Sequence, residues 1–156
     1  MTNWLNWFKH KRQLGDATYT RIKLLSERGN ALAKRNEYIA ALQSYWAAWD
    51  LLPEPKTAWG AATWILAAIG DANFLSGDFA AGRENLTMAM GCPEAVGNPF
   101  LHLRLGQCHF ELNELDQATD ELLRAYMGGG KDLFSADDPR YFEFLTSRVK
   151  APPGGW

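Results

Sequence analysis

Apolar residues recur along most of the chain at the three- and four-residue spacing that places them on one side of an α-helix. Inside these apolar stretches a glycine is followed twelve residues later by a small residue and nineteen residues later by an alanine. The pattern occurs three times, as Gly29-Ala41-Ala48, Gly70-Gly82-Ala89 and Gly106-Ala118-Ala125. Such regular self-similarity predicts stacked helix pairs, because a single pair cannot bury its own apolar side.

Small residues at these positions let the two helices of a pair approach closely. The links inside each pair are short and polar, at residues 35–37, 76–78 and 113–116, and each is expected to hold a residue that caps the second helix. Short links make antiparallel neighbours. We therefore expect three repeats, at residues 16–52, 56–92 and 97–130.

The pattern resembles the tetratricopeptide repeat (TPR), whose signature is W-x2-L-G-x2-Y followed by A-x3-F, A and P over 34 residues. The first copy carries Leu25, Arg28, Gly29, Leu32, Ala41, Tyr45, Ala48 and Pro53 in these positions, and the third carries His102, Leu105, Gly106, His109, Ala118, Leu122 and Ala125. The second copy carries Leu66, Ile69, Gly70, Asn73, Gly82, Leu86 and Ala89. Glycine spacings of 41 and 36 residues indicate insertions between repeats. The resemblance implies an all-α, right-handed α-solenoid of about three TPR-like hairpins.

Both ends of the chain depart from the repeat. Residues 1–15 form an aromatic and basic segment, which we expect to cover the first repeat. The alternative is that this segment lies on a membrane surface. The glycines at 128–130 should end the repeats. We expect a capping helix within residues 137–150, begun by Asp137-Asp138 and covering the last repeat with Tyr141, Phe142 and Leu145, and then a tail at 151–156.

Composition narrows the function classes. A formal net charge of -2 argues against a general nucleic-acid surface, and no apolar run is long enough to insert stably in a membrane. The N-terminal apolar run is too short for a signal peptide, and the two cysteines lie in different repeats, so no disulfide framework is implied. We expect a cytoplasmic protein.

Catalytic chemistry finds little support. The run from Gly128 to Lys131 lacks the frame of a phosphate-binding loop, and its glycines suit a helix end. His102, Cys108 and His109 lie close in sequence, but packing between helices is favoured over a metal site because no second ligand pair is evident. Acidic residues from Glu111 to Glu121 are spaced like a solvated helix face. We expect a protein that is not an enzyme and has no cofactor or metal.

The resemblance implies that the first helix of each pair lines a concave face. Reading from each central glycine gives the candidate partner-binding residues Lys23, Glu27, Asn30, Trp64, Asp71, Phe74, Phe100, Arg104, Gln107, Phe110 and Glu111. Aromatic anchors beside polar groups are typical of a protein-binding surface. The fold is also used to hold a chaperone's C-terminal carboxylate, for which Asn30 and Arg104 match, but Ser26, Ala68 and Phe100 replace the other donors.

These features predict a module that binds one specific protein. A small stand-alone array is similar to bacterial TPR proteins that act as immunity proteins against secreted polymorphic toxins, where the acidic residues Glu27, Asp71, Glu111 and Glu114 would meet a basic cleft. The alternative is an adaptor or secretion chaperone that grips an extended peptide with its aromatic residues.

Overall fold

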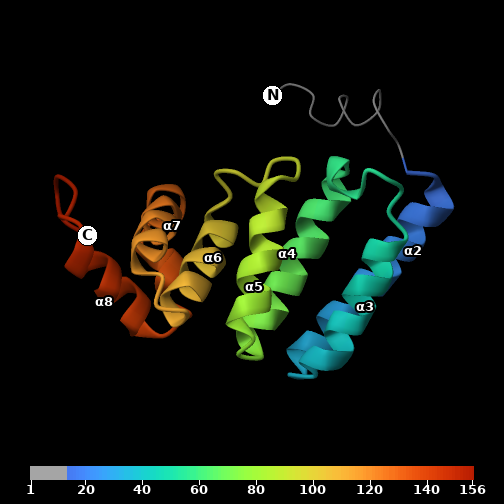
Figure 1. Cartoon of the computed structure of the whole chain (residues 1–156), viewed down its shortest axis with the longest axis horizontal. Coiled ribbons are helices and arrows are strands. Elements are labelled where there is room, and N and C mark those ends of the chain that lie inside the picture. Colours follow the sequence, from blue (N-terminus) through green and yellow to red (C-terminus); the bar gives the residue numbers. More distant parts are fainter. Residues whose placement is uncertain (1–13) are drawn as a thin grey trace.

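The computed structural model describes residues 14–156, and its regular elements there are all helical. In chain order they are α2 (Asp16–Lys34), α3 (Tyr38–Asp50), the short 3-10 helix η1 (Lys56–Ala58), α4 (Gly60–Leu75), α5 (Phe79–Met90), α6 (Pro99–Glu111), α7 (Leu115–Gly129), the 3-10 helix η2 (Lys131–Phe134) and α8 (Pro139–Arg148). Figure 1 shows the α-helices following one another in a row from α2 to α8. The expected all-α solenoid of helix hairpins is confirmed. The expectations for the aromatic and basic N-terminal segment lie outside the described residues, apart from its last two positions.

The three central glycines lie where the helices of each hairpin cross. A Cβ atom added to Gly29 would lie 2.4 Å from the ring of Tyr45, one added to Gly70 would lie 2.4 Å from Leu86 Cγ, and one added to Gly106 would lie 2.8 Å from Leu122 Cγ. Any larger residue would push the paired helices apart.

Each hairpin turns in the same way. Asn36, Gly77 and Asn113, each seven residues after a central glycine, have positive φ angles of 61°, 83° and 60°. The N–H group of the next residue donates to a carbonyl five residues earlier in all three turns, at 2.9 to 3.0 Å. This left-handed ending with its long backbone bond closes the first helix of each pair.

The expected side-chain caps occur in only one of the three turns. Asp78 accepts a hydrogen bond from the Ala81 N–H group at 3.1 Å, but neither Glu37 nor Glu114 caps its helix. The Glu37 carboxylate instead pairs with Arg35 at 2.6 Å. The backbone bonds of the turn therefore begin these helices without a side-chain cap.

The insertion between the first two hairpins is held by two side chains. The Lys56 ammonium donates to the carbonyls of Trp49, Asp50 and Leu52 at 3.3, 3.3 and 2.6 Å, which satisfies acceptors at the C-terminal end of α3. The Trp59 indole N–H group donates to the Pro53 carbonyl at 2.8 Å, and the ring is buried.

The second insertion, before α6, is held by His102. This imidazole accepts at Nε2 from the Gly97 N–H group at 3.0 Å, so the proton lies on Nδ1, which contacts Glu121 at 2.5 Å. His102 is only 5% exposed, so it packs between helices as expected.

The C-terminal region adds a cap to the array. α7 ends at Gly129, and η2, which the sequence did not predict, follows the positive φ of Gly130. α8 then begins with Asp138 accepting from the Arg140 N–H group at 2.9 Å. Tyr141 and Leu145 of α8 are buried in a small core with residues of α6, α7 and η2.

The opposite end is open in the described part of the chain. The positions five before, one before and two after the central glycine are buried in two helices: Ile65, Ile69 and Ala72 in α4, and Leu101, Leu105 and Cys108 in α6. Their equivalents in α2 are Leu24, Arg28 and Ala31, and these are exposed. α4 and α6 pack on the preceding hairpin, whereas no helix of residues 14–156 precedes α2.

Candidate partner-binding face

The candidate face is built from the first helices of the three hairpins, α2, α4 and α6. The positions read from each central glycine are not equally accessible. Those on α2 are exposed, those on α4 are mixed, and those on α6 are mostly covered by the C-terminal region of the chain.

The accessible part, which we call the open half, consists of Lys23, Glu27 and Asn30 on α2 and Trp64 on α4. All four side chains are exposed, and the Trp64 side chain is 39% exposed. The Asn30 side-chain oxygen accepts from the Tyr45 hydroxyl at 2.8 Å, which fixes its orientation. Burial raises the pKa of Tyr45 to about 12, so this phenol stays protonated as a donor. The open half therefore combines one large aromatic side chain with charged and amide groups.

Arg104 is the centre of the other part. Its Nε donates to Asp71 at 2.5 Å, and its Nη1 donates to both Gln107 at 2.8 Å and Asp137 at 2.9 Å. Burial lowers the pKa of this guanidinium, but the two carboxylates outweigh burial and the net pKa is raised. The group is a buried cation with two acidic partners.

Two aromatic rings flank this cation. The Arg104 Cζ atom lies 4.5 Å from the centre of the Phe74 ring and 5.4 Å from that of Phe100. Aromatic faces attract a guanidinium and exclude water from it, which strengthens its ion pairs. The Nε and Nη1 atoms of Arg104, predicted as a partner-binding residue, are therefore already bound inside the protein.

Gln107 lies deeper still. Its side chain has no exposed surface, so in this arrangement no partner reaches it from outside. Its oxygen accepts from Arg104, while its Nε2 is buried without a hydrogen-bond partner. An unpaired buried donor is costly, so this amide marks a polar position that the described residues do not satisfy.

Phe110 and Glu111 are covered by α8. The Phe110 ring centre lies 5.4 Å from Tyr141 and 5.0 Å from Phe144. The Glu111 carboxylate accepts from the Tyr141 hydroxyl at 2.7 Å and from Arg140 at 3.0 Å. Tyr141 was expected to cover only the last repeat.

Tyr141 also reaches the middle repeat, because its ring centre is 6.1 Å from Phe74 of α4. Only 4% of Tyr141 is exposed, and burial together with the bond to Glu111 raises its pKa. We call this part the closed half: it consists of Asp71, Phe74, Arg104, Gln107, Phe110 and Glu111, with Asp137 and Tyr141 filling it.

Sequence reasoning missed Asp137 and Tyr141 as part of this face. Asp137 pairs with Arg104 across 33 residues, and no periodic signal links the two. The only signal was the expected capping helix, which placed Tyr141 near the last repeat without showing how far it would reach.

Of the two residues that match a carboxylate-holding site, Arg104 is already bound to Asp71 and Asp137. Asn30 is held through its side-chain oxygen, which accepts from Tyr45. With Ser26 buried as well, the donors required to grip a free C-terminal carboxylate are not assembled.

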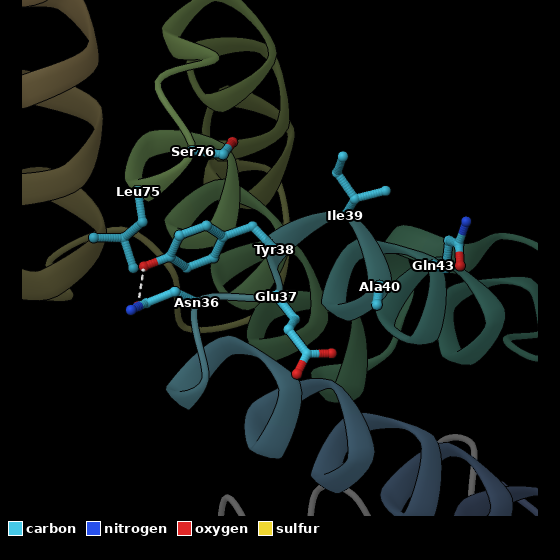
Figure 2. A pocket seen from close by; sticks show the side chains of 8 residues that line it. All are labelled: Asn36, Glu37, Tyr38, Ile39, Ala40, Gln43, Leu75 and Ser76. Carbon is cyan, nitrogen blue, oxygen red and sulfur yellow. Dashed lines mark hydrogen bonds between the residues drawn. The ribbon is translucent and has the colours of Figure 1, made fainter.

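A separate depression lies at the turn edge of the first two hairpins and measures about 640 Å3 (Figure 2). It is lined by Asn36, Glu37, Tyr38, Ile39, Ala40, Gln43, Leu75 and Ser76. Ile39 and Leu75 are 78% and 43% exposed, and the Tyr38 hydroxyl donates to Asn36 at 2.8 Å. Its only ionisable side chains are Glu37, which is already paired, and Tyr38, so it offers shape and apolar area rather than chemistry.

Residues 14–156 contain no group of three or more His, Cys, Asp or Glu side chains placed to hold a metal ion. His109 Nδ1 lies 3.6 Å from Glu114 Oε1. A hydrogen bond from Arg83 lowers the pKa of Glu114. Burial raises the pKa of the Cys108 thiol to about 12, so this thiol is a poor nucleophile.

The acidic residues of α7, which were expected to face solvent, are only partly exposed. Asp116 and Asp120 are 92% and 60% exposed, whereas Glu121 is 19% exposed and bound to His102. Within the described range, no helix has the length and apolar character needed to cross a membrane.

Comparisons with known proteins address the fold. No family model matches the sequence, and no curated protein matches it. Among solved structures, the Arabidopsis OM64 TPR domain is 17% identical, with a TM-score of 0.67 over 85% of this chain and 98% of that domain. The Yersinia enterocolitica type III secretion chaperone SycD, in complex with a peptide of the translocator YopD, is 13% identical, with a TM-score of 0.66 over 85% and 95%. The first TPR of Spaghetti (RPAP3), bound to the HSP90 peptide SRMEEVD, is 19% identical, with a TM-score of 0.62 over 82% and 90%. The TPR resemblance is therefore confirmed at the level of the fold: the chain is a TPR-type helical solenoid closed at its C-terminal end by its own last helix.

Proposed function

We propose that this protein is a non-catalytic binding module that holds one specific protein partner on the open half of its concave face. Trp64 carries the proposal. It is 39% exposed, whereas Trp59, five residues earlier, is buried with its indole N–H group bonded. No hydrogen bond to the Trp64 side chain occurs within the described residues. A Trp that presents both apolar area and a free donor is typical of an interface anchor.

The groups on α2 supply the polar surroundings. Lys23, Glu27 and Asn30 are exposed on α2, the neighbouring first helix. Lys23 occupies the same repeat position on α2 that Trp64 occupies on α4. Mixed charges around an aromatic anchor favour one partner over others, because a wrong partner would leave charges unpaired. The TPR structures with bound peptides support the same use of the fold.

In its most concrete form, the proposal is that the protein acts in the bacterial cytoplasm as an immunity protein that neutralises a cognate toxin. The support is the acidic Glu27, which is exposed on α2 in the same open half as Trp64 and suits a basic toxin cleft. Asp71 and Glu111 contribute less than the sequence suggested, since their carboxylates already bind Arg104 and Tyr141.

The alternative is an adaptor or secretion chaperone for an extended peptide. SycD with its translocator peptide favours this use of the fold. However, the groove available to a peptide is short here, because Tyr141 and Asp137 cover the part contributed by α6. A compact surface seated on Trp64 fits the open half better than a long strand.

The test is an affinity capture of the tagged chain from its native lysate with quantitative mass spectrometry, repeated with Trp64→Ala and Met88→Ala. Met88 on α5 is a matched control, since it is 45% exposed on the second helix of the same hairpin. Loss of a true hot spot weakens binding by about tenfold or more.

One stoichiometric partner that is lost with Trp64→Ala and kept with Met88→Ala supports the proposal. If that partner has a toxin-like catalytic domain, growth rescue by co-expression tests neutralisation. Many weakly bound proteins that share an extended motif favour the adaptor. A partner captured equally by both variants places binding elsewhere and refutes the role of the open half.

A further inference from the structure

The closed half is filled by two side chains from one short stretch of the chain. Asp137 directly precedes Asp138, the residue that caps α8, and Tyr141 lies four residues after Asp137 in the first turn of that helix. The Asp137 carboxylate binds Arg104 at 2.9 Å, and the Tyr141 hydroxyl binds Glu111 at 2.7 Å. Both contacts are made to first-helix positions that face the groove.

The residues that contact Asp137 and Tyr141 include a cation and hydrogen-bonding groups as well as aromatic rings. The Arg104 side chain is only 11% exposed and is flanked by Phe74 and Phe100. Phe74 and Phe110 lie on two sides of the Tyr141 ring, at 6.1 and 5.4 Å. The Arg104 cation therefore binds a carboxylate, the aromatic rings pack on the Tyr141 ring, and the Glu111 carboxylate accepts from the Tyr141 hydroxyl.

The fit is incomplete at one point. Gln107 Nε2 is buried beside Arg104 and has no hydrogen-bond partner among the described residues, and its side chain has no exposed surface. The cis segment therefore leaves one buried donor of this part unsatisfied.

We infer that the closed half is a recognition subsite for a carboxylate followed four residues later by a phenol ring, and that the chain's own Asp137 and Tyr141 occupy it in cis. The inference rests on the proposed function, because it adds a second subsite to the same face. The occupant to which it commits is a partner helix that begins with Asp-x-x-x-Tyr.

Charge complementarity supports an internal carboxylate over a free chain end. Ser26, Ala68 and Phe100 offer no cationic or amide donors, so a terminal carboxylate would lack partners beyond Arg104. A side-chain carboxylate needs only the single cation, and the adjacent helix supplies its own cap, as Asp138 does for α8.

A partner helix has to compete with the cis segment. A tethered segment acts at an effective concentration on the order of millimolar, so the resident helix strongly weakens binding in trans. A partner that also holds the open half would overcome this competition by engaging two subsites at once.

The test uses the full chain carrying Asp137→Ala and Tyr141→Ala, and a capped peptide with the sequence of residues 136–147. We expect the double variant to bind this peptide at least about tenfold more tightly than the unchanged chain does, because the two side chains that occupy the subsite in cis are removed. A peptide with alanine at both positions and the free-acid peptide SRMEEVD serve as controls and should bind at least about tenfold more weakly. Equal binding of all three peptides to a folded double variant overturns the inference.

A measurement on the unchanged chain covers the case in which the double variant does not fold, as judged by circular dichroism. Saturating peptide should then speed hydrogen exchange of the α8 amides without changing α4, and unchanged exchange overturns the inference. Concentration-dependent dimers that exchange α8 would make a second copy the occupant and overturn the commitment to a partner. Trp64→Ala should leave peptide binding unchanged, so failure of the open half and failure of this subsite are separable.

Discussion

The two halves of the concave face share one register and differ in accessibility. One residue after each central glycine stand Asn30, Asp71 and Gln107, and their side chains pass from exposed through 31% exposed to completely buried. Two residues before the glycine, Glu27 is exposed and Arg104 is buried. The repeat decides which way a side chain points, but the chain that follows the repeat decides whether a partner can reach it.

The largest expected difference between the two halves is in the effect of replacing an aromatic residue of each with alanine. Tyr141→Ala should lower the free energy of unfolding by about 3–5 kcal/mol, since it removes a buried ring and one of the two hydrogen bonds that Glu111 accepts, leaving only the bond from Arg140. Trp64→Ala should cost less than about 1 kcal/mol because its ring is partly solvated. Urea unfolding monitored by circular dichroism measures both, and equal losses would erase the distinction between the halves.

A smaller contrast is expected between charges. Asp137→Ala should cost about 1.5–3 kcal/mol, because buried Arg104 keeps only Asp71 as an acidic partner. Lys23→Ala, on the exposed open half, should change stability by no more than about 0.5 kcal/mol. Chemical unfolding at two salt concentrations is the measurement. A Lys23 effect as large as that of Asp137 would mean that the open half is also internally bonded.

The pH dependence of stability at alkaline pH tests one tyrosine in contact with each half: Tyr45, which binds Asn30 of the open half, and Tyr141, which fills the closed half. The pKa of Tyr45 is raised from 10.0 to about 12, and that of Tyr141 is raised as well. The folded chain then binds more protons than the unfolded chain above pH 10, so stability is full below pH 10 and falls as pH rises towards about 12. Unfolding free energies across this range test the sign, and Tyr45→Phe should flatten the fall. Stability that rises with pH in this window contradicts the burial of both phenols.

The smallest effects should be similar in the turns of the first and third hairpins. Asn36 and Asn113 occupy matching turn positions with φ angles of 61° and 60°. Replacing either with glycine relieves similar strain, although Asn36→Gly also removes an exposed hydrogen bond from Tyr38, and each change should shift the free energy of unfolding by less than about 1 kcal/mol. Thermal unfolding of the two variants compares them, and a clearly larger effect in one turn would show that the hairpins are not equivalent.

Sequence predicted what depends on spacing. The glycines at 29, 70 and 106 marked the hairpins because close helix crossing tolerates no side chain there. His102 was expected to pack between helices, and it does, though its bond to Gly97 belongs to an insertion that no repeat encodes. Spacing predicted that Trp64 faces the groove, and the structure shows that this residue is 39% exposed.

Long-range pairing was beyond the sequence. Arg104, Gln107 and Glu111 were assigned to a partner because they face the groove, yet Asp137 and Tyr141 reach them from a helix outside the repeats. The same limit explains η2, a short 3-10 turn set by the positive φ of Gly130 rather than by any apolar period.

Within residues 14–156, the outer side of α2 is not covered by a neighbouring hairpin, so the array could be extended there. Leu24, Arg28 and Ala31 repeat the register that α4 and α6 use to seat the preceding hairpin, while α8 and η2 already pack on α7 at the other end. With Arg28 changed to an aliphatic residue, to match Ile69 and Leu105, whole hairpins could be grafted upstream of Asp16 to lengthen the solenoid. Elongation of this molecule is therefore directional, and it would enlarge the open half while leaving the closed half untouched.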